Sequence, residues 1–160
     1  MIYTAFLLGL ITAGRGKLKL AEDYFSAAFK TDATMSDAAF SLCLLNVQAK
    51  RPLEALPWCQ KAAEITPDEP KFSFSLALLL LDTGNKNGAL ATLSSLNKRV
   101  PRYAEAYLFR GELLENEHDW EGAAQVYRQL LALDGISEHY LAMARKRLDV
   151  LPEMAEKNYR

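Results

Sequence analysis

A period of 34 residues runs through this chain and constrains its fold more than any other feature. Phe6, Phe40 and Phe74 are spaced by 34 residues, and Leu108 follows at the same interval. The same spacing recurs four residues further on, at Leu10, Leu44 and Leu78. A period that is kept over several steps is typical of a repeat array, in which each unit buries its apolar face against its neighbours.

Each period contains two stretches with the apolar spacing of a helix. In the first stretch, one helical face carries Ala5, Leu8, Gly9 and Thr12. Glycines and prolines fall between the stretches, where helices end or begin. We therefore expect a single domain of four helix pairs over about residues 2–35, 36–69, 70–103 and 104–136, a capping helix over 137–151 and a frayed tail over 152–160.

The anchor positions of this period resemble the tetratricopeptide repeat motif. The Leu-Gly element of the first helix corresponds to Leu8-Gly9, Leu42-Cys43, Leu76-Ala77 and Arg110-Gly111. The second helix opens on alanine in every repeat and then carries Phe25, Cys59, Leu93 or Tyr127 at the aromatic position. The resemblance implies an all-α fold, a right-handed α-solenoid of antiparallel pairs with about nine helices. A non-repeating helical bundle is the alternative fold.

Three residues depart from the motif in size. Arg110 stands where the other repeats have leucine, and Leu96 and Leu130 stand where the motif has a small residue. Close packing of two helices requires small side chains at the contact, so we expect the packing to widen at these positions without losing the period.

A second face of the first helix in each repeat lies about 120° from the packing face. The family resemblance implies that this face lines a concave binding groove. Three of its four rows are apolar, whereas the last turns acidic: Phe6, Leu10 and Ala13; Phe40, Leu44 and Val47; Phe74, Leu78 and Leu81; Leu108, Glu112 and Glu115. This pattern fits a protein or peptide partner with apolar anchors and a basic end.

Exposed apolar surface of this extent indicates an interface. The first hypothesis is a non-catalytic interaction module, a scaffold, adaptor or chaperone-like protein that holds a partner segment in the groove. The alternative is a structural role, in which the groove face packs on another copy of the chain or on the rest of a longer protein.

Composition and motifs offer little support for other functions. A net charge of −1 gives no reason to expect nucleic acid as a partner. The two histidines, His118 and His139, lack metal-ligand spacing, and no catalytic arrangement or phosphate-binding loop is present. We expect no cofactor, no metal and no enzymatic activity. The apolar start of the chain carries the repeat pattern, which indicates a first helix and not a signal peptide or membrane anchor.

Two cysteines are too few for a disulfide framework. We expect Cys43 and Cys59 to be buried free thiols, although a bridge between facing helices stays open. The compartment is expected to be cytoplasmic by default, or extracytoplasmic if the chain is a fragment of a longer exported precursor.

Overall fold

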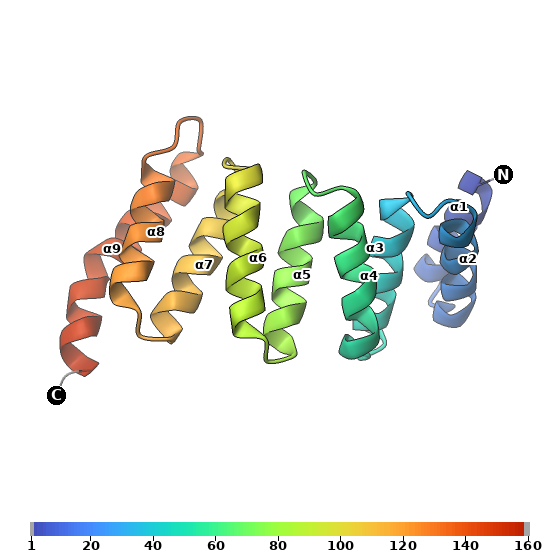
Figure 1. Cartoon of the computed structure of the whole chain (residues 1–160), viewed down its shortest axis with the longest axis horizontal. Coiled ribbons are helices and arrows are strands. Elements are labelled where there is room, and N and C mark those ends of the chain that lie inside the picture. Colours follow the sequence, from blue (N-terminus) through green and yellow to red (C-terminus); the bar gives the residue numbers. More distant parts are fainter. Residues whose placement is uncertain (1, 159–160) are drawn as a thin grey trace. The chain divides into compact units, whose positions relative to one another are not determined.

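The computed structural model describes residues 2–158 and contains, within them, nine helices and no strand (Figure 1). The all-α helical-repeat fold is therefore confirmed. The helices are α1 Ile2–Gly14, α2 Leu18–Thr31, α3 Ser36–Gln48, α4 Pro52–Ile65, α5 Pro70–Asp82, α6 Lys86–Arg99, α7 Ala104–Asn116, α8 Trp120–Leu131 and α9 Glu138–Asn158.

The chain divides into two compact units, Met1–Ala89 and Leu90–Arg160. In the first unit, each of the helices α1 to α4 packs on the next one along the chain. In the second unit, α8 packs on both α7 and α9, and α9 also reaches α7. The single continuous domain stays a prediction.

In the first and the last helix pair, a glycine faces a large aromatic residue. Gly9 of α1 lies under the ring of Phe25 in α2, and a Cβ at Gly9 would come within 2.5 Å of that ring. Gly111 of α7 and Tyr127 of α8 repeat this arrangement in the second unit. Because Phe25 and Tyr127 are both almost fully buried, glycine is required where the two helices touch.

Left-handed backbone recurs in the turn inside each helix pair at intervals of 34 residues. The φ angles are 73° at Gly16, 57° at Lys50, 84° at Gly84 and 61° at His118. In each turn, the next residue donates its backbone N–H to a carbonyl five residues back, as Arg51 does to Asn46 at 2.8 Å. This is the Schellman ending of a helix, for which glycine is the least strained residue.

Lys50→Gly is therefore expected to stabilise the chain. Removal of the Cβ relieves a left-handed strain of about 1–2 kcal/mol, offset in part by the larger entropy that glycine loses on folding. We expect a net gain of about 0.5–1 kcal/mol in the free energy of unfolding, measured by urea denaturation. The reverse change at the equivalent turn, Gly16→Lys, should lower this free energy. Equal stability of both variants and the wild type would contradict the assignment.

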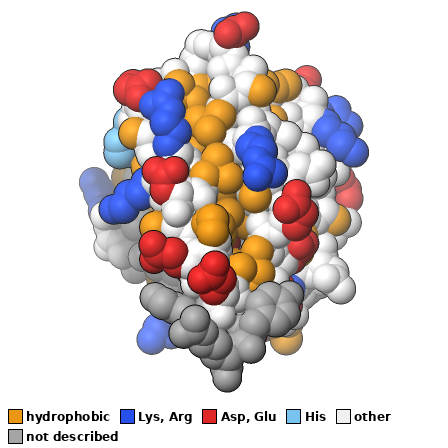
Figure 2. All heavy atoms as spheres, turned by 90° about the vertical axis from the view of Figure 1, so that its left-hand side faces the viewer, with side chains coloured by type: hydrophobic (Ala, Val, Ile, Leu, Met, Phe, Trp, Pro, Cys, Tyr) orange, Lys and Arg blue, Asp and Glu red, His pale blue; other side chains and the backbone are white. Residues whose placement is uncertain are grey.

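The ninth helix is longer than predicted. It continues through Pro152 to Asn158, so residues 152–158 are helical and do not form the expected frayed tail. Residues 159 and 160 lie outside the described residues. The helix persists because its apolar stripe extends to Leu151, which is only 4% exposed, directly before the proline. Over the end of the second unit where α9 lies, Figure 2 shows an apolar strip bordered by charged side chains.

Candidate functional site

The predicted groove rows of the first unit divide into filling and exposed residues. Phe6 packs on the ring of Phe25 at 5.6 Å between centroids, and Phe40 packs on Phe72 at 4.7 Å. These aromatic side chains are half-buried and fill space between helices. Phe74, Leu81 and Ala13 are also half-buried. The exposed members of the rows are the leucines and valine at the later positions, Leu10, Leu44, Val47 and Leu78.

Three of these exposed residues meet at one hollow in the first unit. It has a volume of about 350 Å³ and lies between α3 and α5. Leu44 and Val47 of α3 form one wall, and Leu78 of α5 forms the other. These side chains are 41–48% exposed, although large apolar residues are usually buried. The sequence placed them on one face, and the structure brings them together around a cavity.

A disulfide forms part of the lining of this hollow. Cys43 of α3 and Cys59 of α4 are bonded to each other, with their Cα atoms 5.1 Å apart. The expectation of two free thiols is therefore wrong. The reason lies in the repeat register, because positions 43 and 59 correspond to the touching pairs Gly9–Phe25 and Gly111–Tyr127. The alignment of the repeats therefore indicates that Cys43 and Cys59 lie opposite each other.

The rim of the same hollow carries a carboxylate that the sequence reasoning missed. Asp82, the last residue of α5, lines the hollow and is exposed to solvent. The lining thus combines apolar walls, a disulfide and one acidic group. This arrangement suits an apolar side chain that stands beside a positively charged one.

The fourth predicted row lies in the second unit and does not form an acidic binding end. Leu108 is half-buried against the core of this unit, and Glu112 is exposed. Glu115, in contrast, is buried: its side chain is 2% exposed and pairs with Arg147 of α9. The Tyr127 hydroxyl donates a hydrogen bond to Glu115 at 2.7 Å. The groove assignment of Glu115 is therefore wrong, because α9 covers it.

The same helix also contacts Glu105, near the start of α7. The hydroxyl of Tyr140 in α9 donates to the carboxylate of Glu105. That hydrogen bond, and secondarily burial, raises the pKa of Tyr140. Burial, followed by the bond to Glu115, raises the pKa of Tyr127 far above its ordinary value. Two of the acidic residues of α7, Glu105 and Glu115, thus attach α9.

Within residues 2–158, no group of three or more His, Cys, Asp and Glu side chains is placed to hold a metal ion. Among the helices of that same stretch, none combines the length and apolar character that a membrane span requires.

The repeat register agrees with a known family. A model of the tetratricopeptide repeat family matches residues 6–70 and 74–135. The chain belongs to the tetratricopeptide repeat family. Members of this family are built from helix pairs whose neighbours bury a continuous core. The fold of this chain therefore supports a protein-interaction module in general terms.

Solved tetratricopeptide repeat structures share the fold. One from Parabacteroides merdae superposes with a TM-score of 0.78 at 19% identity, over 99% of this chain and 64% of that one. MamA gives a TM-score of 0.72 at 15% identity, over 98% and 88%. YrrB, described as a TPR protein with an unusual peptide-binding site, gives 0.65 at 21% identity, over 86% and 71%. Identities this low show the fold alone.

A curated relative matches part of the repeat region. The human Protein O-mannosyl-transferase TMTC3 is 30% identical to this chain over 96 residues. That stretch is 59% of this chain but only 10% of the human protein. The similarity therefore concerns a shared tetratricopeptide segment, and most of the human protein has no counterpart in it.

Proposed function

We propose that this tetratricopeptide repeat chain is a non-catalytic interaction module that holds a segment of a partner protein between α3 and α5. The observation that carries the proposal is the apolar hollow of about 350 Å³ whose walls are Leu44, Val47 and Leu78. Its volume suits one or two large apolar side chains. Exposed apolar surface next to a formed cavity is typical of an interface.

The chemistry of the hollow narrows the partner. Apolar walls favour an anchor such as leucine, methionine or phenylalanine on a helical or extended segment. Asp82 at the rim favours lysine or arginine near that anchor, since opposite charges at an interface improve selectivity. In this proposal, the basic end of the partner meets Asp82, and not Glu112 and Glu115 as the sequence pattern predicts. YrrB, with its peptide-binding site, supports peptide capture by this fold.

A peptide selection tests this proposal. We expect peptides selected from a random display library on the wild-type chain to carry an apolar anchor close to Lys or Arg. Leu78→Glu should weaken the selected peptides by about 10-fold or more, because it places a charge at the apolar wall. Leu53→Glu is the matched control, since Leu53 is 71% exposed on α4 and outside the lining of the hollow. Fluorescence anisotropy measures both affinities.

Two results would contradict the assignment of the binding site to this hollow. If selected peptides bind Leu78→Glu as tightly as wild type, the hollow is not the binding site. If Leu53→Glu loses affinity to the same degree, the effect of the charge is not specific to the hollow.

A second candidate function is homotypic assembly through α1. Tyr3, Leu7 and Ile11 form a stripe along this helix, and their side chains are 51–74% exposed. Position 11 corresponds to Leu45, which is buried against the preceding helix pair. Ile11 therefore has the register of a residue on which another helix pair stacks. Light scattering during size exclusion should show concentration-dependent dimers that Leu7→Lys abolishes, whereas a monomer at all concentrations would exclude this function.

A further inference from the structure

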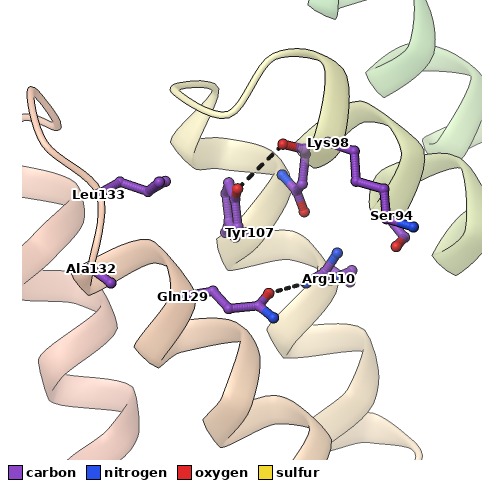
Figure 3. Close-up of a pocket in the computed structure, with 8 residues that line it drawn as sticks. Ser94, Lys98, Tyr107, Arg110, Gln129, Ala132 and Leu133 are labelled. Atoms are coloured by element: carbon purple, nitrogen blue, oxygen red, sulfur yellow. Dashed lines mark hydrogen bonds between the residues drawn. The ribbon is translucent and has the colours of Figure 1, made fainter.

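A second hollow lies within the second unit, on the side of α7 that faces α6 and α8. Its volume is about 410 Å³. Figure 3 shows side chains from all three regions converging on it. The lining includes several polar groups and one large apolar side chain: Asn97 and Lys98 of α6, Tyr107 and Arg110 of α7, Gln129 of α8, and Leu133.

Asn97 is the unusual member of this lining. The residue is only 5% exposed, yet neither its Nδ2 nor its Oδ1 has a hydrogen-bond partner among the residues that the structure describes. Equivalent positions of the other repeats hold Phe29, Ala63 and Leu131, so the repeat fold accepts apolar side chains there. A buried amide without partners is costly, and a native structure that keeps one calls for a reason beyond packing.

Arg110 is the second departure from the repeat pattern. Leucine holds the equivalent place in the other three repeats, at Leu8, Leu42 and Leu76. The guanidinium of Arg110 lies over the ring of Tyr107, 5.7 Å from its centroid, and donates to the neutral Oε1 of Gln129 at 2.8 Å (Figure 3). Burial lowers the pKa of Arg110, an effect that the nearby Tyr107 opposes.

Asn97 and Arg110, which both depart from the repeat pattern, line the same hollow. The lining carries two cationic side chains, Lys98 and Arg110, and no carboxylate. Arginine over an aromatic ring keeps a fixed orientation, and its planar fork matches a carboxylate. The amide of Asn97 can donate and accept, which matches the amide of a ligand. At Arg110, where the sequence predicts wider helix packing, the structure has a polar pocket.

We propose that this hollow binds a carboxylate that has a neighbouring amide. The carboxylate would pair with Arg110, the amide with Asn97, and the intervening carbons would contact Leu133. Such a group occurs as an acidic side chain within a peptide and as a free N-acyl amino acid. The site is separate from the proposed groove, whose lining comes from α3, α4 and α5.

Side-chain NMR signals give a direct test. The 15N-labelled chain is titrated with N-acetyl-glutamate N-methylamide, and the Asn97 side-chain NH2 signals are followed. They are identified by their absence in Asn97→Leu. We expect saturable shifts. Binding should weaken by about 10-fold or more for the neutral glutamine analogue and for Arg110→Gln, since each removes a charge-assisted hydrogen bond.

A parallel titration with N-acetyl-glutamate distinguishes a peptide ligand from a free N-acyl amino acid. Tighter binding of the free acid indicates a small molecule, and tighter binding of the blocked compound indicates a peptide.

Two variants separate binding from folding. Asn97→Leu should abolish binding and raise the urea midpoint, because it removes an unpartnered buried amide. Arg128→Gln, on the exposed face of α8, should leave binding unchanged. The proposal is overturned if the Asn97 signals do not shift, if the glutamine analogue binds equally well, or if Asn97→Leu lowers the urea midpoint, which would assign Asn97 to packing.

Discussion

Replacement of Arg147 by methionine is expected to lower the free energy of unfolding by about 3 kcal/mol. The change leaves the Glu115 carboxylate, which is 2% exposed, with the Tyr127 hydroxyl but without a cation. A buried charge without its counter-ion is among the most destabilising outcomes of a single substitution. We place the effect at the lower end of the range for buried ion pairs because the Arg147 side chain is 40% exposed.

Urea denaturation of three variants tests this expectation. In the double variant Glu115→Leu with Arg147→Met, most of the lost stability should return, because no unpaired charge remains. Arg145→Met is the matched control on the same helix. Arg145 pairs with Glu138 in a salt bridge whose side chains are 53% and 72% exposed, so its loss should cost less than about 1 kcal/mol. If Arg147→Met and Arg145→Met cost the same, the buried pair does not hold α9 to α7.

The residues that join two helices of a pair were predictable from the sequence. The repeat motif places an alanine of each second helix at the contact, and Ala21, Ala55 and Ala123 are fully buried. These positions are predictable because the same physical requirement, a small side chain where two helices touch, applies in every repeat. A pattern that recurs is read from several copies at once.

Residues whose environment occurs only once were not predictable in this way. Glu112 and Glu115 lie three residues apart on one helix, and the first is exposed whereas the second is buried. Helical geometry does not separate them, because residues at this spacing are neighbours on a helix surface. The difference comes from Arg147 of α9, which pairs with Glu115, whereas the equivalent positions of the earlier helices hold Leu45, Leu79 and Leu113. The pocket at Asn97 is similar, since it depends on three helices meeting.

The repeat register places Cys43 and Cys59 where two helices touch, and the bond between them has consequences for stability. Replacing both cysteines by alanine is expected to lower the free energy of unfolding by about 3 kcal/mol, since the bond closes a loop between positions 16 residues apart. Urea denaturation with and without dithiothreitol measures the effect. The reductant should destabilise the wild type and leave the double alanine variant unchanged. A wild type that is insensitive to the reductant after full unfolding would show that the bond does not contribute.

Burial of the disulfide predicts how the chain reacts with a reductant and with an alkylating agent. Cys43 and Cys59 are 0% and 1% exposed, so a reductant should reach them only after local or global unfolding. Disulfides persist in oxidising compartments and are rare in a reducing cytosol. A chain that folds in an oxidising compartment should therefore resist alkylation by iodoacetamide after isolation, and one that folds in the cytosol should take up two labels on unfolding. Mass spectrometry of the chain from its host distinguishes the two compartments.

Because both cysteines line the hollow beside Leu44, the reduced chain should also bind the selected peptides more weakly.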